Sequence, residues 1–102
     1  MIAWVYILRC VDGSYYVGSH RGDDLGARIR QHEAGHGGAY TARRLPVQLV
    51  YSEWFGLIVD AIAAERQIKG WSRAKKEALI SGDFMALPAL ARRRGGRARK
   101  EA

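Results

Sequence analysis

The chain has 102 residues, 48% of them apolar, which is typical of one globular domain with its own hydrophobic core. Its net charge is +7, but residues 91–102 carry +5 of this and the other 90 residues only +2. No apolar stretch approaches the ~18 residues of a membrane span, so we expect neither a membrane protein nor a signal peptide. Cys10 is the single cysteine, which excludes an intrachain disulfide and favours a reducing, cytoplasmic location.

Two strands are predicted at the beginning of the chain. Residues 2–9 are β-branched, aromatic and apolar at both odd and even positions, which predicts a strand buried on both faces. A turn signal at residues 11–14 precedes a second predicted strand at residues 15–19.

The turn between these strands decides which side chains share a face. A two-residue turn would place Tyr6 and Tyr16 on opposite faces of the sheet. A three-residue loop with Gly13 in the left-handed conformation would pair Tyr6 with Gly18 and bring both tyrosines to one face. We expect this bulged loop if the two tyrosines belong to one site.

The rest of the chain alternates predicted helices with one further strand. In order, these elements are a helix from Asp23 or Asp24 to about residue 33, a basic glycine-containing loop at 35–46, a strand at 47–54, and helices at 58–69 and 72–80. The order strand, strand, helix, strand, helix, helix predicts an α+β fold: a small three-stranded, largely antiparallel sheet flanked by three helices. We place the end of the domain at residue 85 and expect residues 86–102 to form a basic, disordered tail.

Three polar residues fall on apolar faces of the predicted helices. Arg28 and His32 share a helix face with Leu25 and Ile29, and Glu65 interrupts the aliphatic seam of the next helix. A buried charge needs a partner, because its desolvation is otherwise costly. The residues alone leave two interpretations: a buried Arg28–Glu65 ion pair that only fixes packing, or a functional site in which Glu65 binds a metal ion.

Three other features of the sequence give weaker evidence of a functional site. His32 and His36 have the spacing of zinc ligands on a helix, but no cysteine or third histidine lies near them in the sequence. The glycines around His36 neither follow a strand nor precede a Gly-Lys-Ser/Thr sequence, so we expect no nucleotide cofactor. Cys10 ends a strand and is interpreted as a small core residue.

The order of these residues resembles the GIY-YIG nuclease superfamily. Its paired signature resembles two triplets of this chain, Trp4-Val5-Tyr6 and Tyr16-Val17-Gly18, which are separated by nine residues. The first triplet lacks the glycine of the family signature. Arg28 and His32 follow at the family spacing, and Glu65 matches the glutamate of a later helix.

The resemblance extends over residues 3–85. The segments 38–51 and 72–80 look like the small stand-alone bacterial members. Many members have an asparagine beyond the glutamate; this chain contains none, and Glu77 stands near that place.

The resemblance implies a metal-dependent DNA endonuclease that hydrolyses phosphodiester bonds by in-line attack of water with one cation. Glu65 would bind Mg²⁺ or Mn²⁺, Arg28 would bind the phosphate, and His32 would relay a proton. Tyr6 or Tyr16 would be the base, with Tyr6 favoured. The expected nucleic-acid contacts are Gly18, Tyr40, Thr41, Arg43, Arg44, Lys75, Lys76 and the basic tail.

Two other functions stay open at this point. A nucleic-acid-binding module with weak or no catalysis is the main alternative, because the asparagine is missing. A protein-interaction adaptor on the same scaffold is the third. DNA repair, recombination and defence all remain as biological roles, and the residues set neither a preferred DNA substrate nor an oligomeric state.

Overall fold

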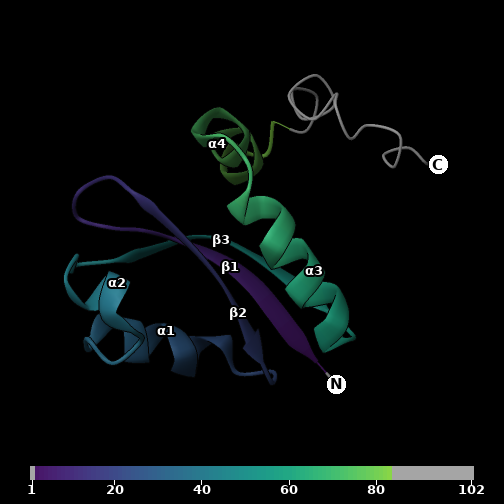
Figure 1. Ribbon diagram of the computed structural model, residues 1–102. Helices are drawn as coiled ribbons and strands as arrows, with labels where there is room; N and C mark the ends of the chain where they lie inside the picture. Colours follow the sequence, from purple (N-terminus) through teal and green to yellow (C-terminus); the bar gives the residue numbers. More distant parts are fainter. Residues whose placement is uncertain (1, 84–102) are drawn as a thin grey trace. The chain divides into compact units, whose positions relative to one another are not determined.

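The computed structural model describes residues 2–83 (Figure 1). These residues divide into two compact units, one ending at Lys69 and the other beginning at Gly70. The first unit contains β1 (Ala3–Arg9), β2 (Tyr15–Arg21), α1 (Leu25–Glu33), α2 (Ala39–Ala42), β3 (Gln48–Phe55) and α3 (Ile58–Lys69). The second contains α4 (Arg73–Ser81). The predicted domain boundary at residue 85 and the predicted tail at 86–102 lie outside the described residues.

The predicted α+β fold is confirmed. The three strands form one sheet in the order β2-β1-β3, and both pairs are antiparallel. The order of the three longer helices also agrees with the prediction. The predicted loop at 35–46 is in part wrong, because Ala39–Ala42 form the short helix α2. Four residues are too few to show helical periodicity, so the sequence pattern gave no signal for this helix.

The turn between β1 and β2 is the predicted three-residue loop. Gly13 has a φ of 85°, a left-handed conformation that glycine adopts readily, and Cys10 N–H donates to the Ser14 carbonyl over 2.8 Å. The resulting register pairs Tyr6 with Gly18 and Leu8 with Tyr16. The two tyrosines therefore lie on the same face of the sheet.

The predicted burial of β1 on both faces is also confirmed. On one face, Tyr6, Leu8 and Cys10 form a core cluster with Leu25 and Ile29 of α1. The alternate residues Ala3, Val5 and Ile7 are fully buried on the opposite face, and α3 packs against both β1 and β2. The sheet thus has an α1 side, which carries the tyrosines, and an α3 side.

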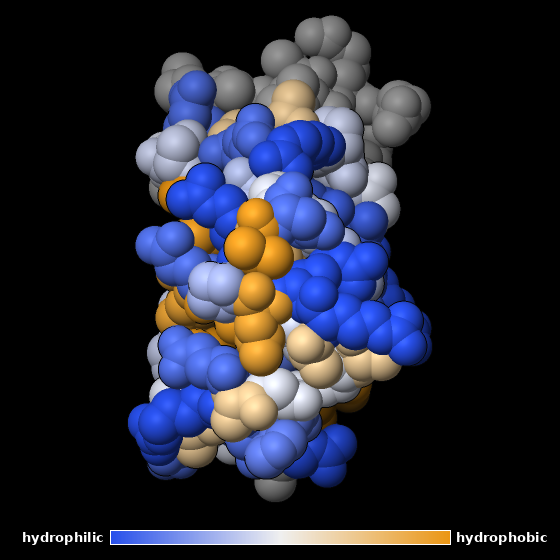
Figure 2. Space-filling view, turned by 90° about the vertical axis from the view of Figure 1, so that its left-hand side faces the viewer, coloured by the Kyte–Doolittle hydropathy of each residue, from blue (hydrophilic) through white to orange (hydrophobic). Residues whose placement is uncertain are grey.

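Exposed apolar residues are scattered over several elements. Figure 2 shows a narrow apolar strip on one face, bordered by hydrophilic side chains. The large exposed apolar side chains among the described residues are Ile2, Val11, Tyr40, Leu49, Trp54, Leu57 and Val59. No helix among the described residues has the length and hydropathy needed to cross a bilayer.

Candidate functional site

Three buried polar side chains from three different elements form a chain of hydrogen bonds. The Tyr6 hydroxyl lies 2.8 Å from Nε2 of His32, and Nδ1 of His32 lies 2.9 Å from the Thr41 hydroxyl. The exposed fractions are 1% for Tyr6, 0% for His32 and 1% for Thr41. Because buried polar groups are costly without partners, each of these side chains depends on the others.

Two glycines leave the space that this chain of hydrogen bonds occupies. A Cβ atom on Gly18 would lie 2.7 Å from both Cζ and the hydroxyl oxygen of Tyr6, and a Cβ on Gly37 would collide with the His32 ring. Gly18 therefore lets the Tyr6 hydroxyl approach the backbone of β2 closely. The sequence did not point to Gly37.

Tyr16 connects this buried chain to the surface. Its ring centroid lies 6.4 Å from that of Tyr6 and 5.3 Å from that of His32. On its other side Tyr16 stacks on Tyr40 at 6.0 Å, and Tyr40 is 39% exposed. The Arg44 guanidinium lies 3.7 Å above the Tyr40 ring. A continuous series of rings thus extends from the centre of β1 to a basic surface.

The Arg28 guanidinium is half-buried beside this cluster. It donates to the Gln31 side chain over 2.9 Å and to the Gly37 carbonyl over 3.5 Å. The Arg28–Glu65 ion pair that one interpretation of the sequence anticipated is not formed, because Glu65 has two other partners. Arg28 therefore keeps a positive charge next to the Tyr6–His32 hydrogen bond.

Burial and the Arg28 charge set the protonation of this cluster. Desolvation, followed by repulsion from Arg28, lowers the pKa of His32 to about 4, so the imidazole is neutral at pH 7. Burial raises the pKa of Tyr6, against the opposing hydrogen bond from Arg28, so its hydroxyl keeps its proton at pH 7. The two side chains thus share a hydrogen bond in which neither is charged.

Glu65 on α3 is held by Ser19 and Lys69. The Ser19 hydroxyl donates to Oε1 over 2.6 Å, and the Lys69 ammonium lies 2.7 Å from Oε2. Burial alone would raise the pKa of Glu65, but the hydrogen bonds from Lys69 and Ser19 outweigh it and hold the pKa below its usual value. The carboxylate is therefore ionised at neutral pH.

Glu65 and the tyrosines approach β2 from different sides. Ser19 pairs with Val5 and so faces the α3 side, whereas its neighbour Gly18 pairs with Tyr6. The Glu65 charge nevertheless contributes to the raised pKa of Tyr6. The structure thus gathers four of the five predicted catalytic residues, Tyr6, Tyr16, Arg28 and His32, and places Glu65 across the edge strand.

The Glu65 carboxylate is a type of ligand that suits a magnesium or manganese ion better than a zinc ion. Mg²⁺ is commonly bound by one or two carboxylates, with water and phosphate oxygens as the remaining ligands. The Glu65 side chain is ionised and 18% exposed, so one oxygen could reach such an ion once Lys69 releases it. Among the described residues no three His, Cys, Asp or Glu side chains are grouped to bind a metal. His32 uses both ring nitrogens for Tyr6 and Thr41, so it is not a zinc ligand.

Three of the predicted nucleic-acid contacts are buried and need correction. Gly18 is buried against the Tyr6 side chain. Thr41 is a partner of His32, and Lys75 is 4% exposed with its ammonium 4.7 Å from the Trp71 ring. Neither side chain reaches a phosphate in this structure. Tyr40 and Arg43 are exposed, whereas Arg44 and Lys76 are half-buried. Ser19 and Lys69 were missed, although the i, i+4 spacing of Glu65 and Lys69 was a usable signal.

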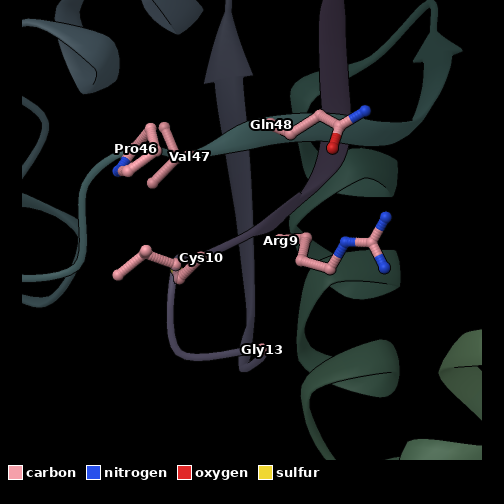
Figure 3. Close-up of a pocket in the computed structure, with 7 residues that line it drawn as sticks. Arg9, Cys10, Gly13, Pro46, Val47 and Gln48 are labelled. Carbon is pink, nitrogen blue, oxygen red and sulfur yellow. The ribbon is translucent and has the colours of Figure 1, made fainter.

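The first unit also has a surface pocket of about 490 Å³ (Figure 3). It is lined by the end of β1, the hairpin loop and the start of β3, with Arg9, Cys10 and Gln48 among the lining residues. Cys10 is buried and belongs to the core cluster, as predicted. The pocket contains none of the predicted catalytic residues.

Comparison with known proteins identifies the family. The GIY-YIG catalytic domain family matches residues 2–78. The chain is 44% identical over 77 residues to a UPF0213 protein of Lacticaseibacillus paracasei, which covers 76% of this chain and 84% of that protein. It is 46% identical over 78 residues to a UPF0213 protein of Staphylococcus saprophyticus, covering 76% of this chain and 93% of that protein. The solution NMR structure of a UPF0213 protein from Bacillus halodurans aligns with a TM-score of 0.53 at 42% identity, covering 79% of this chain and 84% of that one.

The buried, neutral state of His32 predicts a loss of stability in mild acid. A histidine in the unfolded chain titrates near pH 6.5, and His32 in the folded chain at about 4. Between these values the unfolded chain binds more protons, so the free energy of unfolding falls as the pH falls, by roughly 3 kcal/mol over the whole window. Urea denaturation at a series of pH values measures this slope.

Two variants separate His32 from other titrating groups. His32→Gln should show a smaller slope between pH 6.5 and 4, whereas His36→Gln, at an exposed position, should keep the wild-type slope. An NMR titration that places the His32 imidazole near its ordinary pKa would contradict the buried neutral state.

Proposed function

The chain belongs to the GIY-YIG family, and from this premise we propose that it is a divalent-metal-dependent endonuclease that hydrolyses phosphodiester bonds in DNA. The observation that carries the proposal is the buried Tyr6–His32 hydrogen bond of 2.8 Å beside the Arg28 guanidinium. It combines a proton acceptor, a proton relay and an anion-binding group in one place.

Arg28 is the proposed phosphate-binding residue. Its guanidinium is half-buried, and its contact with the Gly37 carbonyl is long at 3.5 Å, so its N–H donors can turn to a non-bridging phosphate oxygen. Because no carboxylate among residues 2–83 pairs with Arg28, its full charge is available to the phosphate and to the additional negative charge that develops during hydrolysis.

Tyr6 and His32 are the proposed proton-transfer pair. The attacking water gives a proton to the Tyr6 oxygen while the Tyr6 hydroxyl proton passes to Nε2 of neutral His32, and the ester P–O bond opposite the attacking oxygen breaks. Thr41 holds His32 through Nδ1 in the orientation that this transfer needs. Tyr16 packs against both rings and positions them.

Glu65 is the proposed ligand of Mg²⁺ or Mn²⁺. When bound, such a cation would supply positive charge that stabilises the leaving oxygen. Because β2 is an edge strand, groups on its two sides can act on one phosphate past this edge. The raised pKa of Tyr6, to which Glu65 contributes, supports this proximity.

The basic surface around Tyr40 is the proposed contact with flanking DNA. Arg43 is exposed, and Arg44 lies over the Tyr40 ring. Lys76 and residues 91–102 are proposed as separate DNA contacts on the basis of their charge. Such contacts hold the phosphate backbone without reading sequence. We further propose a cytoplasmic location, consistent with the free Cys10, and DNA repair is one process that requires this reaction.

A nucleic-acid-binding module with weak or no catalysis is the second candidate. One observation favours it: both oxygens of Glu65 already have partners in Ser19 and Lys69. The chain also contains no asparagine to take the place that many family members fill with one. Salt-sensitive DNA binding without cleavage under any divalent metal would establish this candidate instead.

The proposed site predicts that Arg28→Ala and Glu65→Gln each reduce DNA cleavage about a hundredfold or more, because each removes a charge that acts on the phosphate. Cleavage of plasmid and of flap or branched oligonucleotides, with Mg²⁺ or Mn²⁺, measures the effect. Arg30→Ala and Glu33→Gln remove exposed charges from α1 and should leave cleavage unchanged. Cleavage that survives both Arg28→Ala and Glu65→Gln in folded protein would show that the site is wrong.

The assignment of Tyr6 as the base predicts different effects for the two tyrosines. Tyr6→Phe should lower kcat by about 10²–10⁴, the range of general acid–base catalysis, whereas Tyr16→Phe should have a smaller effect because its ring packing is kept. Single-turnover rates measure both variants, and circular dichroism verifies that the fold is intact. A larger loss for Tyr16→Phe would make Tyr16 the base.

The charge distribution predicts that deletion of residues 91–102 weakens DNA binding and reduces its salt dependence, because six Lys or Arg side chains are removed. Fluorescence anisotropy with a labelled duplex at several salt concentrations gives both quantities. The melting temperature should not change. An unchanged salt dependence would show that the tail does not contact DNA.

A further inference from the structure

The Lys69 ammonium holds one oxygen of the proposed metal ligand, and we propose that Lys69 is a built-in competitor of the divalent cation at Glu65. Its Nζ lies 2.7 Å from Oε2, at the i, i+4 spacing on α3. This inference rests on the proposed function, because it concerns the carboxylate that would bind the metal. It adds the group that sets how readily this carboxylate takes up the ion.

The environment of Glu65 explains why its carboxylate needs a positive charge beside it, whether or not a metal ion is bound. The Glu65 side chain is only 18% exposed, and its other oxygen is bound by the neutral Ser19 hydroxyl over 2.6 Å. An ionised carboxylate that is largely removed from water requires a nearby positive charge. When no metal ion is bound, the Lys69 ammonium provides that charge in direct contact with Oε2.

Lys69 can also leave the carboxylate at low cost. Its side chain is 53% exposed, so the ammonium remains hydrated when the flexible stem swings into solvent. Ser19 does not have to move, because it occupies the other oxygen. Release of Lys69 therefore frees Oε2 for a metal ion while Oε1 stays fixed.

The positive charges around Glu65 lower its affinity for a divalent cation. Lys69 and Arg66 both act on this carboxylate, and a divalent ion that binds Oε2 must displace the first and approach the second. Uptake is consequently weak for the protein alone. A phosphate bound at the same place favours uptake, because it adds negative charge for the ion and for the released ammonium.

Mn²⁺ binding to the full-length chain tests the proposal. Free Mn²⁺ is measured by electron paramagnetic resonance during titration of the wild type, Lys69→Met, Lys69→Arg and Arg30→Met. Lys69→Met should bind Mn²⁺ about five- to tenfold more tightly, as expected for loss of a partly buried competing ion pair. Lys69→Arg keeps the charge and Arg30→Met removes an exposed charge on α1, so both should bind Mn²⁺ as the wild type does.

A second variant set assigns the ion to Glu65. Glu65→Gln and the double variant Glu65→Gln/Lys69→Met should both lose the Mn²⁺ site that Lys69→Met strengthens. If Lys69→Met does not fold, Lys69→Gln replaces it, with the fold verified by circular dichroism in each case. Unchanged or weaker Mn²⁺ binding in folded Lys69→Met, or in folded Lys69→Gln where that variant replaces it, overturns the proposal.

The result is distinguishable from failure of the proposed function. Metal-dependent cleavage by the wild type, together with unaltered Mn²⁺ affinity in Lys69→Met, would overturn only the competitor role. Tighter Mn²⁺ binding in Lys69→Met, in a protein that cuts no DNA, would support the competitor role and overturn the nuclease.

Discussion

The hydrogen bond between the Tyr6 hydroxyl and the His32 imidazole is the constraint on which the site depends. Both side chains are almost completely buried between the central strand β1 and helix α1, so loss of this hydrogen bond would leave a buried polar group unpaired on each of them. The bond therefore fixes how α1 lies on the sheet. It also requires Thr41 on α2 as the second hydrogen-bond partner of His32. Gly18 and Gly37 are needed because a side chain at either position would collide with one of the two rings.

Electrostatics then separate the site into two parts. On the α1 side of the sheet, no carboxylate among the described residues pairs with Arg28. Burial, together with the Arg28 charge, keeps His32 neutral, and the Arg28 charge is available for an anion. On the α3 side, Glu65 has its own cation in Lys69. A direct Arg28–Glu65 pair would have neutralised both groups and left neither for a phosphate or a metal ion. In this structure Ser19 and Lys69 take the two oxygens of Glu65 instead.

Much of this arrangement could be predicted from local patterns. Apolar runs and turn residues gave the strands and the longer helices, and the choice of the bulged loop at Gly13 followed from asking which register brings Tyr6 and Tyr16 to one face. The positions of Arg28 and His32 followed from helical periodicity around Leu25 and Ile29. These features depend on residues close in sequence, where the geometry of a strand or helix fixes direction.

The sequence by itself thus determined the α+β fold, the family, and the set of polar residues that needed partners. Only the tertiary structure decided who those partners are: Thr41 for His32, and Ser19 and Lys69, rather than Arg28, for Glu65. It also buried Thr41 and Lys75, which the sequence alone suggested as DNA contacts. The physical reason is that each buried polar side chain could have been paired with any of several partners at a similar free-energy cost. The packing of elements distant in the sequence selected one partner among them.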